Sequence, residues 1–305
     1  MRIGLTGGAS SVERMIEQAQ RAEADGFTSL WYASAVGGDP LVAIAMAGRA
    51  TSTIELGTSV LQTYTAHPVL QASRAVSVVD GMGRAGFTLG LGPSHRPAIE
   101  DAYGLSYARP GRHTEEYLQV LTALLRGETV HFDGDELRVH AGGPTNADRT
   151  HVPILLAALA PRMLRVAGQL TEGTILWMGN EKAIEVHVAP RLRAAAAEAG
   201  RPAPRIVAGL PVAVHDDADE ARAVAGSVFA GYDELPNYRR LLDIGGADGP
   251  ADAAIVGNEA AVTARIEALF AAGATDVWAA PFPVGDDRSA SRARTRTLLR
   301  ELANS

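Results

Sequence analysis

One histidine occupies a position where it could do chemistry. The run Arg84–Gly92 has the pattern of a buried strand, and Pro93, Ser94 and His95 follow it directly. Imidazole is the side chain whose ordinary pKa allows proton transfer near neutral pH. His95 is therefore a candidate proton donor, and it is equally a candidate for a simple hydrogen bond to a bound ligand.

A second candidate is the strand-to-helix junction in the middle of the chain. The segment Pro153–Ala167 reads P-I-L-L-A-A-L-A-P-R-M-L-R-V-A, so an apolar run ends in small residues before Pro161 can open a helix. Free N–H groups around Ala158–Ala160 would attract an anion at the start of that helix, with Arg162 close by. An ordinary turn has the same sequence, and both interpretations stay open at this point.

Several other chemistries lack the residues they need. The chain contains no cysteine, which excludes thiolate nucleophiles, thiolate metal sites and disulfides. No His-Glu-x-x-His motif occurs and the eight histidines show no ligand spacing, so we predict no metal site. The segment Gly92–His95 lacks the second glycine of a nucleophile elbow. The glycines after the first and fourth expected strands also do not form a dinucleotide fingerprint.

Short apolar runs alternate with amphipathic stretches along most of the chain. The expected strands are 2–8, 27–32, 54–61, 84–92, 152–158, 173–178, 205–215 and 275–281. Eight strands separated by helices predict a closed parallel (β/α)8 TIM barrel, which typically has about 250 residues plus insertions. An open doubly wound sheet is the competing architecture, but it usually has fewer strands and the pyrophosphate fingerprint that is missing here.

The alternation is interrupted between about Ser94 and Arg149. This stretch contains a helix near Arg112–Arg126 and the alternating run Val130–Val139, whose Asp-Gly is typical of a hairpin. We therefore predict one domain over residues 1–305 with an insertion after the fourth strand, at about 94–149. The insertion should cover the carboxyl ends of the strands, where barrels of this class carry their chemistry, and a helical stretch near 232–249 should cover them from the other side.

The residues at these expected strand ends are mostly glycine, alanine, small hydroxyls and aromatics, which suits a large flat ligand. The charges sum to −7 without long runs of one sign, which argues against nucleic-acid and anionic-membrane partners. No apolar stretch approaches the length of a membrane span, and the first residues resemble neither a signal nor a transit peptide. We expect a soluble cytoplasmic protein that acts on a small molecule.

Three long segments, in the right order, resemble a known family. They are I-E-L-G-T-S-V-L-Q-T-Y-T-A-H-P (54–68), G-R-A-G-F-T-L-G-L-G-P-S-H (83–95) and P-I-L-L-A-A-L-A-P-R-M-L-R-V-A-G-Q-L-T-E-G-T-I-L-W-M (153–178), and A-G-A-T-D (272–276) precedes the last strand. The chain is similar to the luciferase-like monooxygenase superfamily, in particular to its F420-dependent, actinobacterial-type oxidoreductase branch. The resemblance implies hydride transfer between the deazaflavin C5 and an organic substrate, with FMN as the alternative cofactor.

The resemblance also implies how the cofactor is held. A bulge with a non-proline cis peptide at Ser59–Val60 would back the ring, the 158–160 backbone would hold a phosphate, and the end of the sixth strand would lie beside the ring. The cofactor-binding residues implied in this way are Ser59, Val60, Leu61, Gly92, Ala158, Leu159, Ala160, Trp177 and Met178. We also expect a homodimer.

The chain departs from its relatives at two positions where some of them carry an acid or a histidine. The stretch Trp31–Ala35 has neither, and Pro93 stands where a relative has glutamate. A proton donor therefore does not carry over, which leaves His95 as the one titratable candidate at its strand end. An FMN-dependent luciferase-like monooxygenase and a cofactor-binding protein without turnover remain as alternatives, and the sequence does not identify the substrate.

Overall fold

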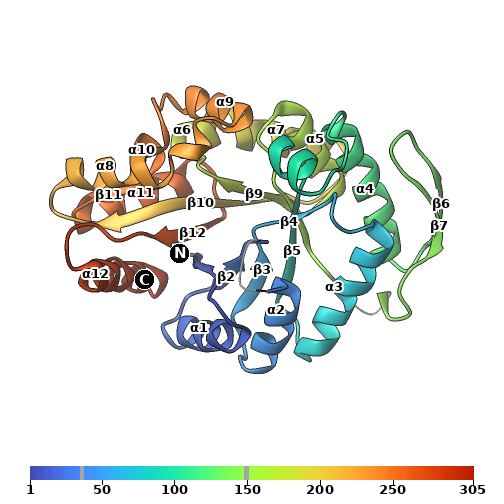
Figure 1. The fold of residues 1–305 in the computed structure, drawn as a ribbon, viewed down its shortest axis with the longest axis horizontal. Helices are drawn as coiled ribbons and strands as arrows, with labels where there is room; N and C mark the ends of the chain where they lie inside the picture. The colour runs from blue at the N-terminus through green and yellow to red at the C-terminus, as the bar shows by residue number, and fades with distance from the viewer. Residues whose placement is uncertain (35–37, 148–150) are drawn as a thin grey trace.

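The structure is a computed structural model that describes residues 1–34, 38–147 and 151–305. Eight parallel strands follow one another around a ring, and the last strand pairs with the first, which closes the predicted (β/α)8 barrel (Figure 1). These strands are β1 (Ile3–Gly7), β2 (Ser29–Tyr32), β3 (Glu55–Thr58), β5 (Phe87–Gly92), β8 (Ile154–Leu156), β9 (Gly173–Trp177), β10 (Arg205–Val214) and β12 (Asp276–Pro281).

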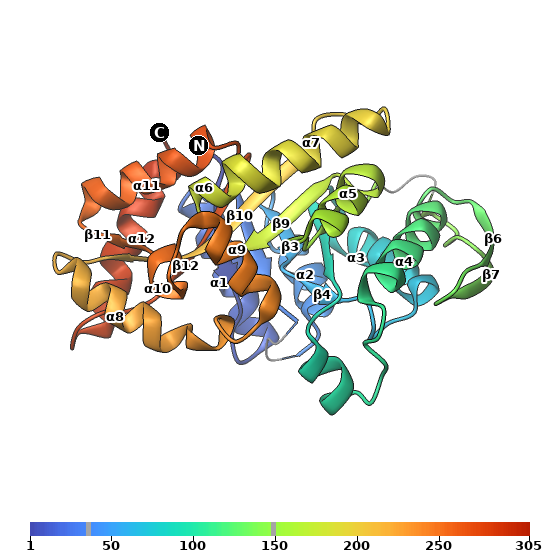
Figure 2. The same cartoon turned by 90° about the horizontal axis from the view of Figure 1, so that it is seen from above.

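Helices surround the strands on the outside (Figures 1 and 2). They are α1 (Val12–Ala24), α2 (Pro40–Arg49), α3 (Pro68–Met82), α4 (Pro110–Leu125), α5 (Pro161–Leu170), α6 (Glu181–Ala183), α7 (Ala189–Glu198), α8 (Ala218–Val228), α9 (Pro236–Gly245), α10 (Pro250–Ala253), α11 (Glu259–Ala271) and α12 (Arg288–Ala303). Among the described residues, no helix combines the length and the apolar character that a bilayer crossing requires.

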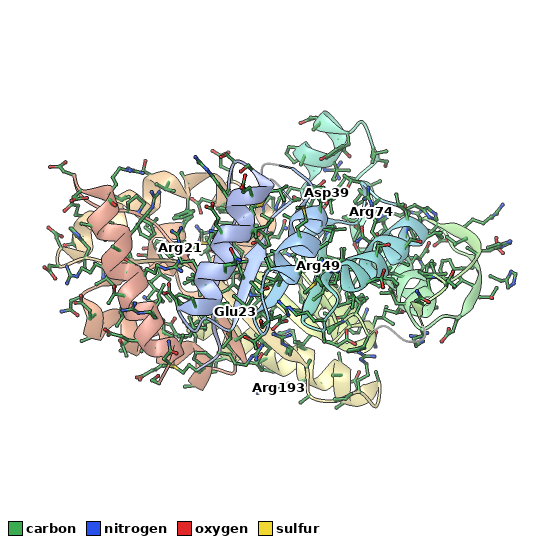
Figure 3. All side chains as sticks on the ribbon, turned by 90° about the horizontal axis from the view of Figure 1, so that it is seen from below. Arg21, Glu23, Asp39, Arg49, Arg74 and Arg193 are labelled. Atoms are coloured by element: carbon green, nitrogen blue, oxygen red, sulfur yellow. The ribbon has the colours of Figure 1, made fainter. Side chains whose placement is uncertain are left out.

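Side-chain caps explain where several helices begin. Ser11 Oγ accepts the N–H of Arg14 before α1, and Asp39 accepts the N–H of Leu41 before α2. Asp39 and Arg49 lie at opposite ends of α2 (Figure 3). His67 Nδ1 accepts the N–H of Val69 at 3.3 Å, so this histidine caps the start of α3.

Aromatic and branched side chains fill the inside of the barrel. Trp31, Leu155, Ile175, Val207 and Trp278 form one buried cluster. Two glycines leave room for its indoles. A Cβ on Gly57 would lie 2.3 Å from the ring of Trp31, and a Cβ on Gly209 would lie 2.0 Å from the ring of Trp278.

Four charged residues pair with one another at the amino ends of the strands, and we call this group the floor. Arg205 Nη1 donates to Glu55 at 2.9 Å, and Arg205 Nη2 donates to Asp276 at 2.7 Å. Arg2 donates to the same two carboxylates at 2.8 and 2.6 Å. Two arginines therefore neutralise two carboxylates, of which Asp276 is almost fully buried.

The region between the seventh and eighth expected strands contains one element that the sequence did not predict. A short parallel strand, β11 (Ile255–Gly257), pairs with Val212–Val214 at the outer end of β10. Three apolar residues between two helices carry no periodicity, so the sequence does not predict this strand.

The third expected strand, 54–61, is divided. β3 ends at Thr58, and β4 (Leu61–Gln62) resumes beside β5.

The insertion after the fourth barrel strand has two parts. The first is a π-helical turn, Ala98–Ala102, which lies with its neighbouring loops away from the body of the barrel (Figure 2). The second is the predicted hairpin, formed by β6 (Thr129–Asp133) and β7 (Arg138–Gly142), which lies beside α4 at the edge of the molecule (Figure 1). The last two residues of the proposed insertion lie outside the described residues.

Candidate functional site

A cavity of about 620 Å³ lies at the carboxyl ends of the barrel strands. Its wall comes from the ends of β3, β5, β8, β9 and β12, together with residues 107–112 of the insertion and residues 236–240 of α9. A pocket at this end of a parallel barrel is the expected place for a ligand. The insertion and the later helical stretch both contribute residues to this wall, although no residue of the hairpin strands does.

The segment that follows β3 has the predicted geometry. The Ser59–Val60 peptide bond is cis, and both residues line the cavity. Two glycines of β5 leave room for this segment, because a Cβ on Gly90 would lie 1.8 Å from the Thr58 carbonyl oxygen and one on Gly92 would lie 2.9 Å from Val60 Cγ2. The buried Ser59 hydroxyl has no hydrogen-bond partner among the described residues.

His95 lies at the cavity, as the sequence analysis expected, and is partly buried. Its ring centroid is 5.7 Å from that of Tyr238 on α9. Burial lowers the pKa of His95, so the imidazole is neutral at pH 7. The preceding Ser94 has a left-handed backbone (φ 63°), and its carbonyl accepts the hydroxyl of Tyr107 at 2.7 Å. The imidazole is thus carried on a segment fixed from the insertion.

The start of α5 provides free donors at another part of the wall. Leu159 and Ala160 line the cavity, and no side chain caps the helix. His187 Nε2 donates to the Leu159 carbonyl at 2.8 Å, which fixes the turn before the helix. Such an uncapped start favours an anion.

Arginine is the only charged residue type in the cavity wall among the described residues. Arg109, Arg112, Arg162 and Arg240 contribute, and no carboxylate does. Three of these four arginines form ion pairs with carboxylates that lie outside the wall. Glu115 binds Arg162 at 2.8 Å, and Asp135 and Glu136 in the hairpin turn bind Arg112 and Arg109 at 3.2 and 2.5 Å.

Two stacked indoles form another part of the wall. The rings of Trp177 on β9 and Trp278 on β12 lie 5.1 Å apart at an interplanar angle of 27°. Gly209 on β10 pairs with both residues in the sheet register, so no side chain separates the rings. Trp278 is 6% exposed, and its indole N–H has no partner within the described part of the chain.

The structure brings most of the predicted site residues together. Those that line the cavity are Ser59, Val60, Gly92, His95, Leu159, Ala160 and Trp177. Three others do not line it. Ala158 and Met178 are buried in the core, and Leu61 packs against that core. Their predicted contact with a cofactor remains a prediction.

Sequence reasoning missed part of the wall. Trp278 lies inside its strand, three residues before the end of the expected strand 275–281, and only the inward alternation of a strand could have indicated it. Tyr238 lies on α9, which has no strand end nearby in sequence. Arg109 precedes the expected helix of the insertion, and nothing in its sequence context marks it.

Comparisons with known proteins agree with this architecture. The model of the luciferase-like monooxygenase family matches residues 1–302. The 5,10-methylenetetrahydromethanopterin reductase of Methanolobus tindarius is 30% identical over 94% of this chain and 87% of its own length.

Two solved structures share the fold. A coenzyme F420-dependent tetrahydromethanopterin reductase from Methanopyrus kandleri aligns with a TM-score of 0.73 at 20% identity, covering 99% of this chain and 98% of its own. The oxygenating constituent of 3,6-diketocamphane monooxygenase from Pseudomonas putida, solved in complex with FMN, aligns with a TM-score of 0.71 at 17% identity, covering 99% and 97%.

Proposed function

The chain belongs to the luciferase-like monooxygenase family and is an oxidoreductase, and from this premise we propose that it transfers a hydride between C5 of coenzyme F420 and an organic substrate. The observation that carries the proposal is that residues distant in the sequence line the same cavity. Ser59–Val60, Gly92 and Trp177, three sites implied to hold the cofactor, come from three different strands and line one cavity.

The residues of the cavity fit such a cofactor. Gly92 leaves open space where a Cβ would approach Val60 and Ala157 to within 3.0 Å, so the wall is flat at that point. The unpartnered Ser59 hydroxyl can hydrogen-bond the edge of a ring. The uncapped start of α5 at Leu159–Ala160 and the four arginines suit a phosphate and further acidic groups.

Each part of the wall then has a task. When bound, the deazaflavin supplies hydride chemistry at C5. Ser59 and Val60 would support one face of its ring, and Arg162 with the start of α5 would hold its phosphate. His95, neutral at pH 7, would either anchor the cofactor edge or move the proton that accompanies the hydride. Residues 107–112 and α9 would exclude water from the site.

Binding of the two cofactors, measured side by side, tests this proposal. We expect purified protein to bind F420 at least tenfold more tightly than FMN, which corresponds to about 1.4 kcal/mol. Titration followed by cofactor fluorescence or calorimetry gives both constants. Equal affinities, or a preference for FMN, would overturn the proposal.

An FMN-dependent monooxygenase is the alternative, favoured by the shared fold of the FMN-bound Pseudomonas putida protein. Oxygen uptake in the presence of FMN and a flavin reductase would support it. A second alternative is cofactor binding without turnover. This alternative is favoured by Ala33 and Ser34, which stand where some relatives carry an acid or a histidine. Ala35, the last residue of that stretch, lies outside the described residues. Tight F420 binding without reduction of any substrate in a broad panel would support it.

A homodimer is part of the proposal. Val42 and Met46 are about half exposed on α2, and Leu70 is equally exposed on the adjacent α3 (helices facing the viewer in Figure 3). An apolar patch of this kind is typical of a protein interface. We expect light scattering to give twice the chain mass of 31.9 kDa, and Met46→Asp to give the single-chain mass. A wild-type protein of single-chain mass would contradict the homodimer.

A further inference from the structure

Arg240 on α9 differs from the other three arginines of the cavity wall. Arg109, Arg112 and Arg162 each form an ion pair with a carboxylate that lies outside the wall. Arg240 lines the same cavity and is exposed, and it has no ion pair and no side-chain hydrogen bond within the described part of the chain. Its charge is therefore available to a ligand that enters the cavity.

The helix that carries Arg240 is fixed by other residues. Asn180 Nδ2 donates to the Gly245 carbonyl at 3.1 Å, which ties the end of α9 to the loop after β9. Arg239, the neighbour of Arg240 in sequence, donates to the Ala247 carbonyl at 2.7 Å. Neither contact involves Arg240, so its side chain has no part in holding the helix, and a change at this position should leave the fold intact.

A second polar side chain, that of Asn237, lies on the same face of α9. Asn237 and Arg240 are three residues apart, a spacing that places two side chains side by side on a helix, and both line the cavity. The Asn237 amide forms no side-chain hydrogen bond with another described residue. Tyr238 lies between them in sequence, and its ring centroid is 5.7 Å from that of His95, so this turn of α9 lies beside the segment that follows β5.

The charge of the wall favours an anionic ligand at this turn. No carboxylate among the described residues lines the cavity, although the chain as a whole has a net charge of −7. Burial lowers the pKa of His95, so the imidazole is uncharged at pH 7 and adds no second cation beside Tyr238. One unmatched guanidinium balances one negative charge, which fits a carboxylate, whereas a phosphate monoester carries nearly two.

We propose that Arg240, with Asn237 beside it, binds the carboxylate of an acidic organic substrate and so selects this class of substrate. The inference rests on the proposed function and deepens it, because it names the class of compound that exchanges the hydride. Arg109, Arg112 and Arg162 then serve the acidic groups of the cofactor, and Arg240 serves the substrate. A guanidinium offers two parallel N–H donors to a carboxylate, and an amide beside it can add a third.

Benzoate and benzamide separate the charge of such a compound from its shape. Both are planar and nearly equal in size, and only benzoate is anionic at pH 7. Calorimetric titrations are made into the complex of the protein with F420, in which the cations proposed for the cofactor are occupied. We expect benzoate to bind about tenfold more tightly than benzamide, the effect of one hydrogen bond between charged groups.

Arg240→Gln should bring the ratio of benzoate to benzamide affinity to near one and should leave the affinity for F420 within about twofold of the wild-type value. Arg240→Lys should keep part of the preference, because it retains the charge and loses the paired donors. Arg165→Gln is the matched control. It removes the same charge from an exposed position on α5 outside the cavity wall, and it should keep the ratio.

A second readout needs no variant. Salt screens the attraction between an exposed guanidinium and a carboxylate, so raising the ionic strength from about 0.01 M to about 0.1 M should weaken benzoate binding to the wild-type protein several-fold. The affinity for uncharged benzamide should stay the same. Equal salt dependence of the two probes would overturn the inference.

The titrations are made with and without F420, which separates this inference from the proposed function. Failure of F420 to bind would overturn the proposed function, and the benzoate to benzamide ratio of the free protein would still test Arg240. A ratio near one in the wild-type protein, or no benzoate binding at millimolar concentration, would overturn the inference. So would a preference that persists in Arg240→Gln or disappears equally in Arg165→Gln. A loss of F420 affinity in Arg240→Gln with an unchanged ratio would assign Arg240 to the cofactor and overturn it as well.

Discussion

The polar groups at the two ends of the barrel differ in whether they have hydrogen-bond partners within the protein. At the floor, Arg2, Glu55, Arg205 and Asp276 satisfy one another with four hydrogen bonds between 2.6 and 2.9 Å. At the mouth, where the strands end in the cavity, the Ser59 hydroxyl and the Trp278 indole N–H have no partner among the described residues. Polar groups at the floor are complete within the protein and stabilise it, whereas these two groups at the mouth have no partner within the described part of the protein.

The largest expected effect of a substitution lies at the floor. Asp276→Asn removes the buried one of the two carboxylates that Arg205 and the half-exposed Arg2 share, and we expect it to lower the free energy of unfolding by about 3–5 kcal/mol. Urea unfolding measures this change, and F420 affinity of the folded variant should stay the same. Asp219→Asn is the control, because the exposed pair with Arg222 should contribute less than about 1 kcal/mol. A loss as small as that of the control would contradict the role of the floor.

The floor also predicts an acid dependence. Although burial alone would raise it, hydrogen bonds and the charge of Arg205 lower the pKa of Asp276 below its ordinary value. A carboxyl with a lowered pKa contributes stability that is present above the ordinary aspartate pKa and is lost as the pH falls through the lowered value. Wild-type unfolding free energy should therefore drop below about pH 4, and less so in Asp276→Asn.

At the mouth, His95→Ala distinguishes two roles. We favour an anchor, because a reaction at C5 can take its proton from solvent or substrate. The variant should then lose about 0.5–3 kcal/mol of F420 binding while keeping the turnover of saturated enzyme. A proton donor would instead show a kcat lower by about 10²–10⁴ with F420 affinity nearly unchanged. A variant normal in both respects would remove His95 from the site.

The pH profile sharpens this test. Because burial lowers the pKa of His95, the imidazolium form is populated only below the ordinary histidine range. If that form donates the proton, wild-type kcat should rise as the pH falls below about 6.5. A flat kcat from pH 6 to 8 would agree with the anchoring role.

The adjacent hydroxyls of Thr58 and Ser59 differ in whether they have hydrogen-bond partners. Thr58 Oγ1 bonds both the carbonyl and the N–H of Gly90, at 2.8 and 2.9 Å, whereas Ser59 Oγ has no partner. Thr58→Val should lower the free energy of unfolding by about 1–3 kcal/mol. Ser59→Ala should leave it unchanged or slightly higher, and should weaken F420 binding by about twofold to tenfold. Equal destabilisation by both changes would show that Ser59 is satisfied within the protein.

The smallest expected effect is a dependence of stability on pH in the histidine range. Burial lowers the pKa of both His95 and His113. Between the lowered pKa and the ordinary value the unfolded chain binds more protons than the folded one, so stability should fall as the pH decreases from 7 toward 5. The slope of the unfolding free energy against pH should be shallower in His95→Gln. An unchanged slope would show that this histidine titrates normally.

The sequence allowed the barrel to be predicted because eight apolar runs alternate with helical stretches, which is a local signal. The bulge at Ser59–Val60 was implied by family resemblance, since nothing in the residue types alone demands it. Trp278 and Tyr238 escaped prediction for a different reason. Each reaches the cavity through the closure of the barrel, which brings together strands and helices that are far apart in sequence, and no local pattern contains that information.

Because of the short strand β11, the segment that contains α9 begins and ends at neighbouring points on the barrel. The chain leaves the sheet after Val214 and returns at Ile255, and these two points are joined by parallel pairing of Val212–Val214 with Ile255–Gly257. The intervening residues, including α9, therefore form an excursion that starts and finishes at one place on the barrel. Such an excursion can change in sequence or length without moving a barrel strand, so the cavity residues that α9 contributes can vary independently of those that the strands contribute.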